Sequence, residues 1–143
     1  MNRIRIGRLI ISAMIALIVF FAVEFILEQV IGRYVFAGII DEWVELSSIL
    51  NWSAVNYVIN ILIFLASCIM VMWLYAALRP MFGVGPKTAL ITGAFVLTFI
   101  SAYAINEANL GIYPLQVTLI QLFYWVVELP LAVIAGAYYY EAG

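Results

Sequence analysis

The stretch LQVTLIQLFYWVVELPLAVIAGAYYY, Leu115–Tyr140, is an apolar run with one carboxylate, Glu128, near its middle. A transmembrane helix needs about 20 consecutive, predominantly apolar residues. The run therefore predicts a membrane span that carries an acidic group inside the hydrocarbon. We expect the rest of the chain to follow the same plan, with apolar spans joined by short polar segments.

The composition of the whole chain also indicates a lipid environment. Of its 143 residues, 68% are hydrophobic and 10% are charged, which is too little charge to cover a soluble domain of this size. A net charge of −2 provides no basic surface for nucleic acid. Histidine is absent, and the one cysteine, Cys68, lies in an apolar run and reads as a buried thiol. We therefore expect no cofactor, no metal site and no enzymatic activity.

Three further apolar runs precede this stretch. The predicted spans are residues 9–31, 53–78, 88–103 and 115–140. Between the first two, apolar residues at helical spacing predict a short amphipathic helix over residues 39–51 that lies in the interface. Its acidic face is either solvated or docks a partner. The predicted fold is therefore all-α: a polytopic membrane protein, a single membrane domain over residues 1–143, with four transmembrane helices in an antiparallel bundle plus the interfacial helix.

Basic residues gather at one side of these spans. Arg79 and Lys87 lie in the joint between the second and third spans, and Arg3, Arg5 and Arg8 lie at or before the start of the first. Only Arg33 falls on the other side. The positive-inside rule then places both termini and the 79–87 joint in the cytoplasm. We expect a multi-pass protein of the cell membrane, the inner membrane of a prokaryote.

The 79–87 joint has one candidate role besides connecting two spans. Pro86 suits the first turn of a helix, whose free backbone N–H groups would lie beside Lys87. With Arg79, this arrangement is a candidate contact for a lipid phosphate. The alternative is a rigid hairpin joint with cationic anchors.

The same joint carries a resemblance. The segments WLYAALRP (73–80), Phe82-Gly83 and GPKTA (85–89) resemble the central joint of a family of small, uncharacterised prokaryotic membrane proteins with four predicted helices. The pair Glu128-Leu129 and the small residues at 135–137 are similar to that family's last helix, whereas Met81 departs from its basic residue. The resemblance implies the four-helix topology and no particular activity.

Glu128 lies roughly 20 Å along its span, near the bilayer midplane. Gln121 and Tyr124 precede it by seven and four residues and share its helix face. An acidic residue at the middle of a membrane costs about 2.5–3.5 kcal/mol, and no lysine or arginine lies within a span to pair with it. We therefore expect a partner, a bound proton or a water-filled space at Glu128.

Polar residues of the other spans coincide with Glu128 and Gln121 in depth, between the midplane and the outer interface. Glu24 comes from the first span, and Asn56 and Asn60 come from the second, where they either hold helices together or line a cavity. If the three faces meet, they form a polar pocket that opens to the outside. Its candidate residues are Glu24, Glu28, Asn56, Asn60, Gln121, Tyr124 and Glu128.

Two classes of function follow from this cluster. The first is a non-enzymatic membrane module, a homo-oligomer or a subunit beside other membrane proteins, in which Glu128 donates a hydrogen bond to an amide on a neighbouring helix. The alternative is a small transporter in which Glu24 and Glu128 exchange protons for a cation or a cationic hydrophobic solute. The sequence favours the module. In both classes the lipid bilayer is a partner and nucleic acid is not.

Overall fold

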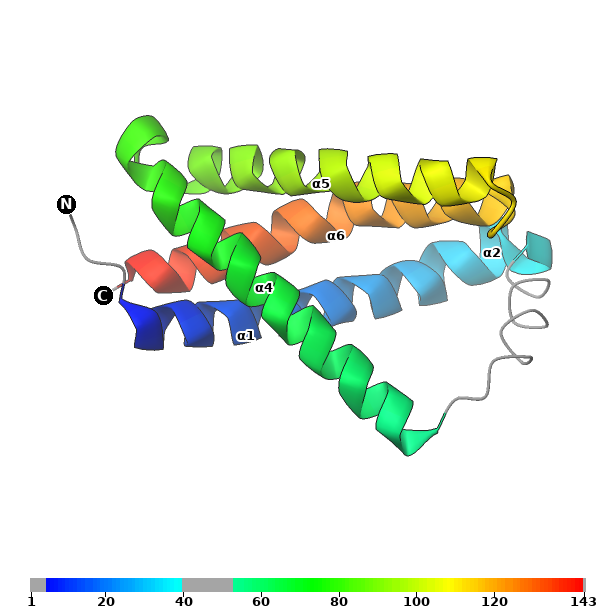
Figure 1. The fold of residues 1–143 in the computed structure, drawn as a ribbon, viewed down its shortest axis with the longest axis horizontal. Coiled ribbons are helices and arrows are strands. Elements are labelled where there is room, and N and C mark those ends of the chain that lie inside the picture. Colours follow the sequence, from blue (N-terminus) through cyan, green and yellow to red (C-terminus); the bar gives the residue numbers. More distant parts are fainter. Residues whose placement is uncertain (1–4, 40–52, 143) are drawn as a thin grey trace.

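The computed structural model describes residues 5–39 and 53–142. Within these ranges the chain is helical and forms no strand, and four of its helices are long and apolar enough to cross a membrane. Neighbouring helices run antiparallel, and α4 (Ala54–Phe82) lies diagonally across the others (Figure 1). The prediction of an all-α, four-helix, multi-pass membrane protein is thus confirmed.

The start of α1 (Ile6–Leu27) and the end of α6 (Leu115–Glu141) lie at one end of the bundle, together with the turn between α4 and α5 (Pro86–Asn109) (Figure 1). The helical elements are α1 (Ile6–Leu27), η1 (Glu28–Gly32, a π-helix), α2 (Arg33–Val35), α4 (Ala54–Phe82), α5 (Pro86–Asn109) and α6 (Leu115–Glu141). The interfacial helix expected over residues 39–51 lies outside the described residues, except for Ile39.

Three helices extend further than the hydropathy pattern predicts, and one of them, α4, runs past residue 78 to Phe82. The helix α5 continues past residue 103 to Asn109, because the polar segment that follows has no glycine or proline before Gly111, where φ is +73°. The first span continues through the π-helix η1 to Val35 instead of ending near residue 31. Polar side chains alone therefore do not end these helices.

The joint between α4 and α5 folds as a tight glycine turn. Gly83 and Gly85 have φ values of +88° and +116°, which glycine adopts without a steric penalty. The hydroxyl of Thr88 donates a hydrogen bond to the Gly83 carbonyl at 2.6 Å, and Pro86 is the first residue of α5. These contacts hold α4 and α5 in a rigid hairpin.

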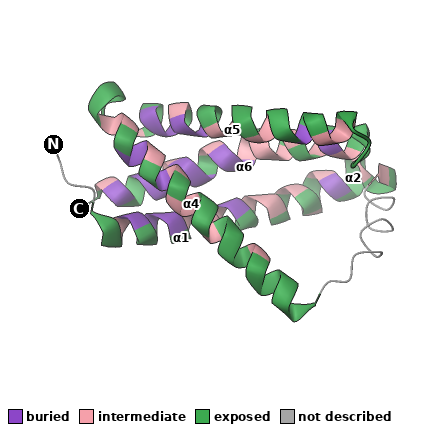
Figure 2. Ribbon diagram, viewed as in Figure 1, coloured by how far each residue is buried: buried purple, intermediate pink, exposed green. Residues whose placement is uncertain are grey.

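The core lies mainly in the half of the bundle nearer the termini (Figure 2). Small residues of α1 and α6 meet there, which lets the two backbones approach closely. A Cβ atom at Gly136 would lie 2.7 Å from the Met72 sulfur and 2.9 Å from the Ser12 carbonyl oxygen. Position 136 therefore has no room for a side chain while the α1–α6 seam stays in place. The seam is built by Ser12, Ala13, Ala16, Ala132, Val133, Gly136 and Ala137.

We expect the substitution Gly136→Leu to destabilise the bundle by about 1–3 kcal/mol, the usual cost of overpacking. The measurement is the midpoint of thermal unfolding in mild detergent. Gly7→Leu is the matched control, because a side chain at Gly7 would meet open space. A Gly136→Leu variant that melts with the wild type would show that the seam is not packed as described.

Candidate functional site

A pocket of about 300 Å³ lies between the first span and α6, toward the end of the bundle away from the termini. Its walls combine two carboxylates, an amide, a phenol and three aliphatic side chains. They belong to Glu24, Glu28, Ile39, Val117, Ile120, Gln121 and Tyr124. Four of the seven residues of the sequence-predicted polar cluster are therefore brought to one pocket.

Helical spacing explains why these side chains meet. Glu24 and Glu28 are four residues apart and lie on one side of the first span. Val117, Gln121 and Tyr124 follow one another at intervals of four and three along α6. Glu28 is also the first residue of η1, and π-helical turns inside long helices occur often at functional sites. The two acidic side chains on α1 and η1 thus lie opposite an amide and an aromatic ring.

Glu128 lies one helical turn beyond Tyr124 on the same face of α6, toward the middle of the bundle. Its side chain is 0% exposed, and neither carboxyl oxygen has a hydrogen-bond partner among the residues that the structure describes. Glu128 interacts electrostatically with Glu24, and Tyr124 does so with Glu24, Glu28 and Glu128. The three glutamates therefore form one electrostatic group around Tyr124.

The two asparagines of the predicted three-helix cluster lie outside this pocket. Asn56 is exposed, Asn60 is half-buried, and neither lines the pocket. Because α4 crosses the bundle diagonally, its first half diverges from α1 and α6 (Figure 1). Depth along a span is visible in a sequence, whereas the crossing angle of a helix depends on packing against its neighbours. The pocket is consequently formed by two spans and not by three.

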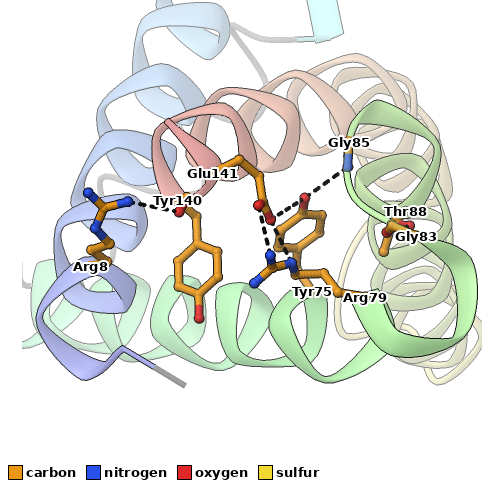
Figure 3. A network of polar contacts seen from close by, with 8 residues as sticks. All are labelled: Arg8, Tyr75, Arg79, Gly83, Gly85, Thr88, Tyr140 and Glu141. Atoms are coloured by element: carbon orange, nitrogen blue, oxygen red, sulfur yellow. Dashed lines mark hydrogen bonds and ion pairs between the residues drawn. The ribbon is translucent and has the colours of Figure 1, made fainter. Parts of the chain in front are cut away.

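A second polar cluster closes the bundle at the end where the termini lie (Figure 3). Arg79 forms a bidentate ion pair with Glu141. Its Nε lies 2.6 Å from Oε1, and its Nη2 donates to Oε2 at 2.8 Å. The hydroxyl of Tyr75 donates to Glu141 Oε1 at 3.1 Å and accepts from the Gly85 N–H at 3.2 Å. This cluster fastens the ends of α4 and α6 to the start of α5.

Two further contacts extend this cluster. Arg8 donates to the Tyr140 carbonyl at 3.4 Å and so binds a free carbonyl group at the end of α6. The Arg79 guanidinium carbon lies 5.2 Å from the centre of the Tyr140 ring, a distance typical of cation–π contacts. All four long helices therefore meet at this end of the molecule.

The ion pair changes the interpretation of Arg79. The guanidinium is held by Glu141, whereas Lys87, the other predicted lipid-phosphate contact, is exposed. A phosphate contact at Lys87 stays a prediction. Sequence reasoning did not single out Glu141, although a signal was present: opposite charges end the second and fourth spans on the same side of the membrane.

Replacing a tyrosine with phenylalanine should have different effects on stability in the two polar clusters. We expect Tyr75→Phe to lower stability by about 1–3 kcal/mol, because the Gly85 N–H loses its acceptor and Glu141 loses one of its donors. The matched variant Tyr124→Phe should leave stability unchanged or slightly raised, because the buried Tyr124 hydroxyl has no partner among the described residues. Thermal unfolding in detergent checks both. Equal losses in the two variants would contradict this assignment.

Comparisons with protein-family models, with curated proteins and with solved structures found no match to this chain. Within residues 5–39 and 53–142, no three cysteine or acidic side chains lie close enough together to hold a metal ion. The chemistry of the site is therefore argued from its own residues. Glu24 and Glu28 are at least partly accessible and line the pocket with Tyr124, and Glu128 is buried one helical turn away.

Proposed function

We propose that the protein is a small, non-enzymatic transporter that exchanges protons for a cation at Glu24 and Glu128. The observation that carries this proposal is the environment of Glu128, which is fully buried and has no hydrogen-bond partner among the described residues. A carboxylate in such a place is costly unless it binds a proton or a cation. Glu24 adds a second acidic group within electrostatic range.

The burial of Glu128 without a hydrogen-bond partner among the described residues favours transport. The sequence alone favours the packing module. As a packing element, Glu128 would donate its proton to an amide of a neighbouring helix. Gln121 lines the pocket on the same helix as Glu128, and the asparagines of α4 lie outside it. An acidic group that is buried without such a partner keeps its proton, and it can release the proton when a cation takes its place.

The asymmetry of the bundle supports the same proposal. Arg79, Tyr75 and Glu141 fasten the helices at the end near the termini, and the pocket lies toward the opposite end. A carrier in one of its resting states is closed on one side and accessible on the other. With the basic residues in the cytoplasm, the accessible side is the outside of the cell.

The test is a flux measurement in proteoliposomes that contain a pH-sensitive dye. An inward gradient of an organic cation should drive protons out through the wild-type protein, and the double variant Glu24→Gln/Glu128→Gln should match protein-free liposomes. Flux that persists unchanged in the double variant would contradict the proposal, and so would a wild-type protein that carries no protons.

A second candidate, a subunit of a larger membrane assembly, is favoured by α4. The first half of this helix leaves the bundle and is exposed around most of its circumference. A second copy or another membrane protein would cover this surface. Cysteine crosslinking from position 59 in native membranes, in a Cys68→Ala background, tests this candidate: a specific crosslinked species supports it, and its absence rules against a permanent partner there.

A further inference from the structure

The pocket between the first span and α6 has two chemically different sides. Glu24 and Glu28 supply negative charge from the first span, whereas Val117, Ile120 and the Tyr124 ring supply an apolar and aromatic surface from α6. Its volume of about 300 Å³ lies at the lower end of the range for small-molecule sites. A proton alone needs no such space.

A second observation indicates that the site takes a positively charged ligand. Glu128 is 0% exposed, and its carboxyl oxygens have no hydrogen-bond partner within the described residues. Its face of α6 carries Gln121 and Tyr124, and it interacts electrostatically with Glu24, which forms the opposite wall. Glu128 does not itself line the pocket, and it lies one helical turn beyond Tyr124 on the same face of α6. The helix α6 carries no lysine or arginine, and the only one on α5 is Lys87, at the start of that helix.

The distribution of the acidic groups bears on the kind of cation. Glu24, Glu28 and Glu128 are not gathered into a group with metal-ligand spacing. Glu24 and Glu28 line the pocket together with Tyr124, and Glu128 lies one helical turn beyond Tyr124 on α6. Small metal ions need several oxygen atoms at contact distance. A bulky organic cation is held differently, by charge acting over a longer distance and by contact with an aromatic face.

We propose that the pocket binds a monovalent organic cation with an aromatic or apolar body. The cation enters as Glu128 releases its proton, so that one positive charge replaces another and the net charge of the site does not change. This inference rests on the proposed function and names its substrate class. The charged head lies beside Glu24 and Glu28, with Glu128 one helical turn beyond Tyr124, and the apolar body lies against Tyr124 and Ile120.

The experiment measures binding of radiolabelled benzyltrimethylammonium to the full chain in nanodiscs, with empty nanodiscs subtracted. The label should be displaced by excess unlabelled benzyltrimethylammonium. It should not be displaced by neopentylbenzene, a neutral molecule of the same shape. In weakly buffered solution, binding should release close to one proton per bound cation. Displacement by the neutral molecule would overturn the proposal, because charge would then play no part in recognition.

Three variants locate the site. Glu24→Gln and Tyr124→Leu should each weaken binding about tenfold or more, the effect of losing one good polar or aromatic contact. Glu107→Gln is the matched control, because it removes a carboxylate at the same end of the bundle that does not line the pocket. Equal binding in Glu24→Gln, Glu107→Gln and the wild type would place the cation elsewhere and overturn the proposal.

The same measurement separates this inference from the proposed function. Benzyltrimethylammonium binding without proton release supports the pocket and contradicts proton exchange. Coupled proton flux driven by another cation, without specific benzyltrimethylammonium binding, contradicts this substrate class and leaves the proposed function standing. Calcium is added at concentrations that unfold neither the wild type nor Glu107→Gln. Displacement of the label under these conditions would overturn the proposal that the site binds an organic cation, and would favour a metal ion.

Discussion

The substitution Glu128→Gln is expected to reduce proton-coupled flux in proteoliposomes by about tenfold or more while the bundle stays folded. The amide has nearly the size of the neutral acid and also lacks a charge, so the packing around position 128 should survive. An amide, however, does not titrate in the physiological range. The variant therefore removes the proposed proton site without removing the side chain that fills the core.

The control for this prediction is Glu107→Gln, which should transport like the wild type. Thermal unfolding of both variants shows whether the bundle is intact, and we expect Glu128→Gln to melt no lower than the wild type, because a buried acidic group is exchanged for a neutral one. Wild-type flux in Glu128→Gln would contradict the assignment. A lower melting point together with wild-type flux would show that Glu128 is a packing element.

Among the substitutions considered, Arg79→Gln is expected to lower the free energy of unfolding the most. The upper bound is about 3–5 kcal/mol, because Glu141 loses its charged partner at a partly buried site. The side chains of Arg79 and Glu141 are 23% and 22% exposed, so solvent screens part of this effect. Tyr75 then remains as a single donor to Glu141. The measurement is denaturation in detergent with the wild type alongside.

The charge-swapped double variant Arg79→Glu/Glu141→Arg is the matched control. It restores opposite charges across the same gap and should recover part of the lost stability, which isolates the pairing energy from the effect of each single change. The single variants of this cycle are Arg79→Glu and Glu141→Arg. If the stability loss of the double variant equals the sum of their two losses, the ion pair contributes nothing measurable, and Tyr75 and packing alone hold this end together.

The sequence was sufficient to predict the class of fold, because a transmembrane helix must satisfy its backbone internally and therefore appears as a long apolar run. The run from Leu115 to Tyr140 matches α6 to within a residue at its end. The end of α5 was harder to predict from the sequence. Polar residues such as Asn106 and Glu107 indicate where the chain leaves the lipid, and a helix can continue beyond that point. Glycine at 111 marks that end more closely.

The candidate site was predictable along each helix but not between helices. Spacing alone placed Gln121, Tyr124 and Glu128 on one face, and depth placed Glu24 level with them. The position of Asn60 could not be predicted in this way, because the diagonal course of α4 results from contacts that no local pattern encodes. Arg79 and Glu141 are 62 positions apart in the sequence and join the ends of two helices. Only the opposite signs of their charges could have suggested this ion pair.

The central claim is that Glu128 binds and releases a proton inside the membrane, and infrared difference spectroscopy of the protein in nanodiscs tests it most directly. Spectra recorded between acidic and alkaline pH should contain several protonated-carboxyl components, because the chain has eight acidic residues. One component should titrate in the wild type and in Glu107→Gln and be missing in Glu128→Gln. A titrating band that is identical in Glu128→Gln and the wild type would contradict the claim.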